Sequence, residues 1–522
     1  MTKYDAILIG AGHNALACAA HLAKRGWKVG LFEAADLPGG AVKTLELTEP
    51  GFRHDLAAMN LSLFAGSAFN RTYGAELTRL GLEFAPVQDC FASVFPDGRW
   101  LGVSTDPAAT TARIRAFSTR DAETWEGLIK AFPARAERLF SILGAPMKKR
   151  ALARILFTLL RRDGLSGTLD LGRFLLSSPR AWLDETFESS EVKALLGAWG
   201  MHLDFAPDIA GGAVFPYLEG MANQNFGMVL GKGGADTIVK ALAAMVETHG
   251  GTIECNARVE QLVVEGGRAV GVVLADGRRI EASRAVVATI SPRALAGLLP
   301  QGSGNARFDR KVREFRHAPG TMMIHLAVDS LPDWADPALQ RFAYVHVAPS
   351  LDVMARAYQE AQAGLLPAEP VVVVGQPTAI DPSRAPDGKH VLWLQTRVVP
   401  AEIKGDAAGI ITDRDWETVR EAYADRAISI IERYAPGLSA KIIKRTVMSP
   451  LDLERGNANL VGGDQICGSH HLAQNFLFRP APGFADWSTP VRNFHLAGAA
   501  TWPGAGVGAG SGFLLAKQLA GG

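Results

Sequence analysis

The sequence predicts an α/β protein in which a Rossmann-like dinucleotide-binding domain is interrupted by a helical cap and by an α+β domain. Three observations carry this prediction. The chain opens with a β-prone run, a glycine-rich turn, a helical stretch and a second β-prone run. The middle of the chain loses this alternation, first for helical and then for strand-rich stretches. Residues 481–522 return to a short strand and a glycine-rich junction with a final helix.

Length, composition and charge indicate a globular protein of several domains and argue against nucleic-acid binding. The 522 residues correspond to roughly three domains at about 150 residues per domain. Apolar residues make up 48% of the chain and charged residues 20%, which is ordinary for a globular protein. Because 54 Lys and Arg nearly balance 53 Asp and Glu, we expect no nucleic-acid partner.

The cysteines and the hydropathy pattern indicate in which compartment the protein works. None of the four cysteines has CxxC spacing, and no Cys/His cluster has the spacing of a zinc site, so we expect no bound metal and a reducing compartment. The first strand begins near Tyr4 and leaves no room for a signal peptide. No apolar run reaches 18 residues, so we expect a cytoplasmic protein without a transmembrane helix. Contact with a membrane surface stays open.

The first turn has the residue types of a dinucleotide-binding loop. It follows the strand Tyr4–Ile9 and reads Gly10-Ala11-Gly12-His13-Asn14-Ala15. Gly10 permits the tight turn, Gly12 lets a pyrophosphate approach the backbone, and Ala15 lets the helix pack on the strand. The helix N-terminus then offers free N–H groups to phosphates. Glu33, at the end of the second strand, is placed to bind ribose hydroxyls.

A second glycine pair, Gly39-Gly40, follows the acid and indicates that the chain folds back over the dinucleotide. The segments GAGHNALACAAHLAKRG, FEAADLPGGAVKT and GFRHD resemble the start of the phytoene desaturase-like FAD-dependent oxidoreductases. That family lies within the wider amine oxidase and glutathione reductase-like superfamily. The GHN form of the loop is closest to the branch of pyridine nucleotide-disulphide oxidoreductase domain-containing proteins. The resemblance implies FAD as the cofactor and a glutathione reductase type of FAD-binding domain.

The C-terminal residues extend the resemblance. The pattern SPLDLE, GGD, RPAPG, LAGA and PGAGV is similar to the same branch, with Trp502 where the family usually has His. Glycine density at a strand-to-helix junction brings backbone N–H groups close to a flat or anionic ligand, here the N1–C2=O edge of a flavin. We therefore expect both ends of the chain to contribute to one FAD site. The predicted cofactor-binding residues are Gly10, Gly12, His13, Asn14, Ala15, Glu33, Gly39, Gly40, Thr44, Val259, Gly498, Ala499, Gly506 and Val507. Val259 comes from the resemblance alone.

These signals predict a discontinuous cofactor domain. Its parts are residues 1–88, 223–291 and 481–522, separated by a mostly helical insert at 89–222 and a substrate domain of sheet and helices at 292–480. Apolar runs at 321–328, 342–347, 371–374 and 391–398 predict strands of one sheet in the substrate domain.

The helical insert contains a basic amphipathic stretch, Lys148–Arg162. One interpretation is a helix at a membrane surface or at the mouth of an apolar channel. The other is a cap helix packed on the core. The resemblance implies that the segments 201–204 and 215–220 border the substrate cavity. His202, Asp204, Tyr217 and Glu219 are therefore candidate polar groups near a substrate, and each has a structural interpretation as well.

The sequence therefore predicts an FAD-dependent dehydrogenase or desaturase that moves a hydride to flavin N5 and removes a proton from an apolar substrate. A carotenoid-like, lipid-like or cyclic ketone-like molecule fits the resemblance. The candidates for catalysis are His202, Tyr217 and Trp502, and no residue is assigned as the base. The alternatives are an amine oxidase-like enzyme and a non-catalytic FAD-binding regulatory or interaction protein. Oxygen, a quinone or a protein remain open as electron acceptor, and so does the oligomeric state.

Overall fold

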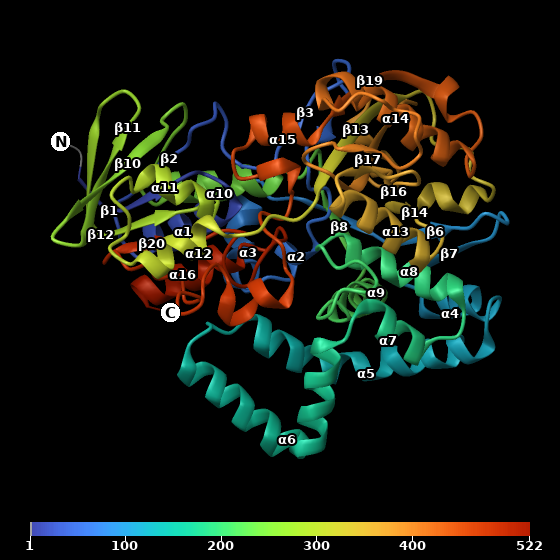
Figure 1. Cartoon of the computed structure of the whole chain (residues 1–522), viewed down its shortest axis with the longest axis horizontal. Helices are drawn as coiled ribbons and strands as arrows, with labels where there is room; N and C mark the ends of the chain where they lie inside the picture. The colour runs from blue at the N-terminus through green and yellow to red at the C-terminus, as the bar shows by residue number, and fades with distance from the viewer. Residues whose placement is uncertain (1–2, 522) are drawn as a thin grey trace.

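The computed structural model describes residues 3–521 and is organised around two seven-stranded sheets. In Figure 1 the first sheet lies at the left, the second at the upper right, and helices α4 to α9 lie below the second sheet. Both chain ends lie on the side of the first sheet.

The first sheet contains the chain's opening β-α-β unit. Strands β1 and β2 pair in parallel, and helix α1 connects them. From Ala6 onward β1 is buried, as expected for a parallel strand that is covered on both faces. The strand order is β10-β11-β12-β1-β2-β9, with β20 on β12. The strands are β1 (Lys3–Ile9), β2 (Val29–Phe32), β9 (Thr252–Glu254), β10 (Val259–Glu265), β11 (Arg268–Leu274), β12 (Arg279–Ala288) and β20 (Phe494–Leu496).

Strand β12 joins the two ends of the chain. Its residue Val286 is in register with Ile7 of β1 on one side and with Phe494 of β20 on the other, and both pairings are parallel. Helix α16 (Gly510–Ala520) then packs against α1 (His13–Lys24). Strands β1 and β20, about 490 residues apart along the sequence, therefore flank the same strand, and the helices that follow them pack together.

The second sheet has the strand order β19-β13-β17-β16-β14-β6-β7. All four predicted strand regions between residues 321 and 398 lie in it. On β17, Leu392 and Leu394 pack toward α14, whereas Trp393 faces the core that contains α8 and α9. The strands are β6 (Asp89–Val94), β7 (Trp100–Ser104), β13 (Gly320–Val328), β14 (Tyr344–Val347), β16 (Val371–Gly375), β17 (His390–Val399) and β19 (Ile442–Met448).

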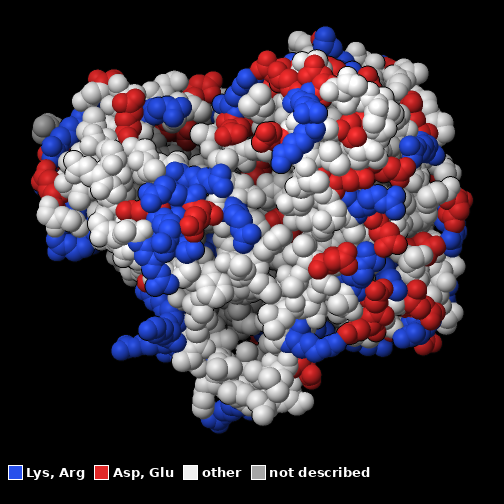
Figure 2. Space-filling model, in the orientation of Figure 1, with Lys and Arg blue, Asp and Glu red and all other residues white. Residues whose placement is uncertain are grey.

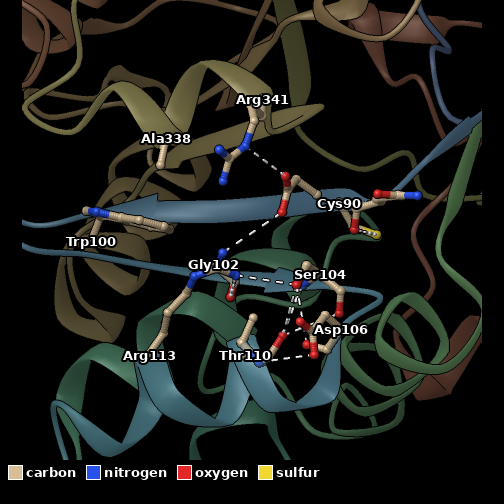
Figure 3. Close-up of polar contacts among 12 residues, drawn as sticks. Cys90, Trp100, Gly102, Ser104, Asp106, Thr110, Arg113, Ala338 and Arg341 are labelled. Carbon is tan, nitrogen blue, oxygen red and sulfur yellow. Dashed lines mark hydrogen bonds and ion pairs between the residues drawn. The ribbon is translucent and has the colours of Figure 1, made fainter.

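The β6–β7 hairpin ties the start of the helical insert to the second sheet. Arg341 donates a hydrogen bond to Asp89 at 3.2 Å, and Arg113 donates to the carbonyl of Gly102 at 3.2 Å (Figure 3). The Thr110 hydroxyl accepts from the Ser104 amide at 3.1 Å. These contacts connect the hairpin to α4, where the helices begin, so the insert starts as two extra strands of the second sheet.

The helical insert is a layer with one projecting arm. Helix α6 breaks at Gly164, whose φ of +68° lies in the left-handed region, and its two halves form a bent arm at the lower end of the molecule (Figure 1). The helices are α4 (Pro107–Arg115), α5 (Thr119–Leu143), α6 (Lys149–Leu176), α7 (Pro179–Thr186), α8 (Ser190–Met201) and α9 (Val214–Phe226).

A buried ion cluster connects three distant segments. The Arg384 guanidinium contacts the carboxylates of Asp55 and Asp381 and donates to the carbonyl of Gly231 at 2.6 Å. Asp55 also accepts from the amide of Ala235 at 2.7 Å. Because an unpaired buried charge costs several kcal/mol, about 3–5 in measured cases, this cluster constrains how the segments meet.

The remaining elements connect the two sheets or cover them. They are α2 (Ser62–Ala65), α3 (Ala68–Arg79), α10 (Thr237–Thr248), α11 (Leu295–Leu298), α12 (Ala306–Arg313), α13 (Leu351–Gln362), α14 (Trp416–Glu432) and α15 (Pro450–Gly456), with the short strand pairs β3 (Thr44–Leu45) and β4 (His54–Asp55), β5 (Phe84–Val87) and β8 (Met228–Gly231), and β15 (Leu365–Leu366) and β18 (Gly405–Asp406).

Candidate active site

The first glycine-rich loop leaves open space beside its backbone. A Cβ on Gly10 would lie 2.8 Å from Thr289 Oγ1, and the φ of Gly10 is +93°, so this position requires glycine. A Cβ on Gly12, in contrast, would have no atom of the described residues within 4 Å. Gly12 is therefore needed for something other than the packing of the chain itself.

Two helix N-termini close to this space have no side-chain cap at their own N-cap position. Helix α1 begins after Gly12 and α16 begins after Ala509, and neither has an acidic residue in its first turn. In α16 the amide of Gly512 donates to the side chain of Asn14, which leaves the two amides before it without a side-chain partner among the described residues. The first N–H groups of a helix have no partner within the helix and carry a partial positive charge. Both ends are therefore suited to an anionic or electron-rich ligand.

Glu33 and the start of β10 lie side by side at the edge of the loop. The Glu33 carboxylate accepts hydrogen bonds from the amides of Ala11 at 2.7 Å and Ala35 at 2.9 Å, which hold it against the loop. The amide of Ala257 donates to the carbonyl of Glu33 at 2.8 Å. This contact brings Val259, the first residue of β10, to the same edge.

The second glycine pair folds back onto the first loop. The amide of Gly39 donates to the carbonyl of Ala11 at 2.9 Å, and a Cβ on Gly40 would lie 3.4 Å from the Cα of Gly12. Thr44 is placed differently from the glycines. Its hydroxyl donates to Asp55 at 2.7 Å and accepts from the amide of Asp236 at 3.2 Å, so both hydrogen-bonding roles are used within the protein.

His13 and Asn14 connect the first loop to the C-terminal residues. The Asn14 side chain accepts from the amide of Gly512 at 3.2 Å, and its Nδ2 lies 3.0 Å from His13 Nε2. The backbone of Gly506 also lies beside the His13 ring, where it partly offsets the effect of burial on the pKa of that ring. Burial lowers the pKa of His13 to about 4, which keeps the ring neutral at pH 7. Its role here is to join the two loops.

The C-terminal loop is held by two residues that the motif analysis did not single out. The Arg479 guanidinium donates to the carbonyl of Ala499 at 2.8 Å and is fully buried. His470 Nε2 accepts from the amide of Ala505 at 3.0 Å, and burial lowers the pKa of His470 well below its ordinary value. Arg479 lies within the quoted RPAPG pattern, but nothing in the sequence pattern around His470 indicates its contact.

Gly498 and Val507 complete the predicted set. The Gly498 amide donates to the hydroxyl of Ser511 at 3.0 Å, so the strand end is joined to the first turn of α16. Val507 is half-buried and packs against the core that contains α1. The structure thus brings the predicted residues of both chain ends into one region.

This region fits FAD. The space beside Gly12 and the uncapped end of α1 suit the pyrophosphate, Glu33 and Val259 suit the adenosine half, and the uncapped end of α16 suits the flavin edge.

The three candidates for catalysis do not form one cluster among the described residues. His202 Nε2 lies 3.2 Å from His346 Nε2, and burial lowers the pKa of both rings, that of His346 to about 3. Tyr217 packs among the aromatic rings of α5, α6 and α7, with the guanidinium of Arg135 over its own ring. The indole of Trp502 donates to the carbonyl of Ala145 at 2.8 Å.

Asp204 and Glu219 have different surroundings. Asp204 accepts from the hydroxyl of Tyr358 at 2.8 Å and lies 3.3 Å from His471 Nε2, and burial raises its pKa. Glu219 contacts the Asn223 amide at 3.3 Å, stays partly exposed, and has a pKa that burial raises to about 7.

An apolar pocket lies between the helical arm and the C-terminal loop. Most of its lining is apolar, and it opens to solvent. Helix α5 lines it with Leu139 and Ile142, and α6 with Leu175. The opposite wall includes Trp502 and Ala505, next to the predicted flavin-edge residue Gly506.

Comparisons with known proteins show the family to which the chain belongs. The model of the flavin-containing amine oxidoreductases matches residues 16–509. The chain belongs to this family. Within it, the chain is 29% identical to the rat pyridine nucleotide-disulfide oxidoreductase domain-containing protein 2, over 97% of this chain and 91% of the relative. It is 26% identical to a phytoene dehydrogenase of Streptomyces griseus, over 99% and 95%.

A solved oxidoreductase from Methanosarcina mazei has the same fold, with a TM-score of 0.63, 18% identity, and coverage of 99% of this chain and 100% of that one. Family membership confirms the predicted resemblance to phytoene desaturase-like flavoproteins and the mixed α/β fold. The chain is an FAD-dependent oxidoreductase, which favours the catalytic over the non-catalytic interpretation.

Replacing Gly12 with valine separates cofactor binding from folding. The added side chain would enter space that no described residue fills, so we expect the apoprotein of Gly12→Val to unfold within about 1 kcal/mol of the parent. Because that space suits the pyrophosphate, FAD affinity falls by at least about a hundredfold, or about 2.7 kcal/mol. Denaturant unfolding and FAD titration measure the two quantities.

A matched control is Gly127→Val on α5, where a Cβ also meets open space far from the loop. This variant keeps its FAD affinity. A Gly12→Val protein that purifies with one FAD per chain contradicts the assignment of the loop.

Proposed function

We propose that this oxidoreductase is a dehydrogenase or desaturase that removes a hydride and a proton from an apolar substrate, such as a carotenoid-like, lipid-like or cyclic ketone-like molecule. The observation that carries the proposal is the apolar pocket, which runs from α5 and α6 to the loop at Ala505. The relative that dehydrogenates phytoene supports it.

In this proposal each part of the fold has its own role. The first sheet serves as an FAD-binding unit of the glutathione reductase type, the second sheet as the substrate unit, and α4 to α9 as the cap. Bound FAD supplies the acceptor for the two electrons of the hydride. The chain supplies the cradle for the cofactor, an apolar channel for the substrate and a group that takes the proton.

Glu219 is the proton acceptor in this proposal. It lies on α9, and its carboxyl group is one of the charges that raise the pKa of Tyr344, after burial and the carboxyl group of Asp55. A base works best when its pKa is close to the working pH. Glu219 meets this condition at about 7, whereas burial makes His346 a weak base with a pKa of about 3.

An amine oxidase-like activity is the second candidate, and one feature favours it. The rings of Tyr344 and Trp393 lie 5.8 Å apart on the inner face of the second sheet, and His346 stacks parallel to Tyr344. Aromatic faces attract ammonium groups. All three rings are buried, since Tyr344 and Trp393 are 3% exposed and Trp502 is 1% exposed, but Trp502 packs on Phe476 and not on this face.

Anaerobic reduction of the bound flavin distinguishes the two candidates. The purified holoprotein is mixed without oxygen with polyenes and cyclic terpenes in detergent, and separately with alkyl and aryl amines. We expect the visible flavin absorption to bleach with an apolar alkene or ketone and to persist with the amines. Bleaching by amines alone contradicts the dehydrogenase proposal and supports the second candidate.

The pH dependence of that bleaching tests Glu219. A proton acceptor must be ionised, so the rate of flavin reduction rises with pH through about 7 and levels off above it. Glu219→Gln removes the rising limb and slows reduction by about a hundredfold or more. The matched control Glu247→Gln, at an exposed position of α10, keeps both rate and profile. A Glu219→Gln variant with the parent profile contradicts the assignment.

A further inference from the structure

Large apolar side chains are exposed to solvent on the helical arm and on the end of α5 next to it. Seven of the fifteen large apolar side chains that are exposed in residues 3–521 lie on α5 and α6. We call these seven the apolar face, and they are 39% to 67% exposed. Its members are Phe140, Leu156, Phe157, Leu160, Leu165, Leu169 and Leu176.

The apolar face runs along both halves of α6. In the first half, Leu156, Phe157 and Leu160 occupy neighbouring positions of one helical side, while Leu152 and Leu159 turn toward the body and pack against its cores. In the second half, Leu165 and Leu169 are four residues apart, while Phe174 is buried. The apolar residues of the predicted amphipathic stretch thus lie partly on a side that faces the body and partly on a side that faces outward.

Basic side chains border the apolar face without acidic partners. Residues 148–162 contain six Lys or Arg and no Asp or Glu. Arg162 pairs with Glu137 of α5, which holds the arm in place. The other five form no ion pair with any described residue: Lys148, Lys149, Arg150, Arg154 and Arg161. Figure 2 shows a largely uncharged surface at the lower end of the molecule, with Lys and Arg at its margins.

We propose that the arm docks on an anionic lipid surface, with the apolar face in the headgroup region and the five free cations against lipid phosphates. An apolar stripe beside a basic border is the pattern of an interfacial helix. No helix within residues 3–521 is long and apolar enough to cross a bilayer, so the contact is peripheral. A protein partner with an apolar surface would not require five uncompensated positive charges.

Docking would also place the apolar pocket at the membrane. Leu139 and Leu175, which line the pocket, belong to the same two helices that carry the apolar face. A substrate dissolved in the lipid could therefore enter without crossing water. This consequence rests on the proposed function, whereas the docking itself does not.

Vesicle flotation tests the docking with the full-length holoprotein. We expect co-flotation with vesicles of phosphatidylcholine and phosphatidylglycerol, and at least about tenfold weaker partitioning to phosphatidylcholine alone or in high salt. The triple variant Arg150→Gln, Arg154→Gln, Arg161→Gln lowers partitioning to the mixed vesicles by about tenfold or more. Its control is Arg79→Gln, Arg307→Gln, Arg414→Gln, at exposed cations elsewhere, which floats like the parent.

The apolar contribution needs its own variant. Leu156→Ser, Phe157→Ser, Leu160→Ser lowers partitioning by about tenfold or more, whereas Ile410→Ser, Ile443→Ser, which alters exposed apolar residues elsewhere, does not. Bound-flavin absorbance shows that each variant stays folded. Flotation requires no turnover, so its result is independent of the substrate assignment.

Three outcomes overturn the proposal. In the first, the parent protein stays at the bottom of the gradient when it is mixed with the phosphatidylcholine and phosphatidylglycerol vesicles. In the second, neither triple variant floats less than the parent. In the third, sedimentation velocity without lipid shows a dimer that the serine variant converts to a monomer. The last result would show that a second copy of the chain covers the apolar face.

Discussion

The close approach of the first and last helices is the constraint on which the candidate site depends. A Cβ on Gly512 of α16 would lie 1.9 Å from the carbonyl oxygen of Asn14 on α1, so the backbones touch with no side chain between them. The Asn14 side chain accepts from the Gly512 amide across this contact. Only because these helices meet do both uncapped N-termini lie in one region.

The rest of the fold supports this contact and leaves room beside it. Strand β12 pairs with β1 and β20 at once, so the strands that lead into the two helices are already in register. Arg479 and His470 hold the carbonyl of Ala499 and the amide of Ala505, so the C-terminal loop keeps its path. The long middle of the chain can then form a second sheet and an arm without disturbing the cofactor region.

The sequence was most informative where chemistry restricts residue type. Glycines at a turn leave a pattern that can be recognised, and the opening β-α-β unit and the glycine-rich C-terminal junction were predicted from it. His13 shows the limit, because its link to Gly506 depends on a loop nearly 500 residues away. Arg384 shows the same, since no local spacing indicates that it meets Asp55. Which side of α6 faces water also depends on packing.

The most direct measurement of the central claim is hydrogen–deuterium exchange of the full chain with and without FAD. The account predicts that FAD slows exchange at both ends together, in peptides that cover residues 10–15 and in peptides that cover 498–512. In this account each end offers backbone N–H groups to the same ligand, so neither should be protected alone. Protection confined to the N-terminal loop, with unchanged exchange at the C-terminal loop, would contradict a site built from both ends.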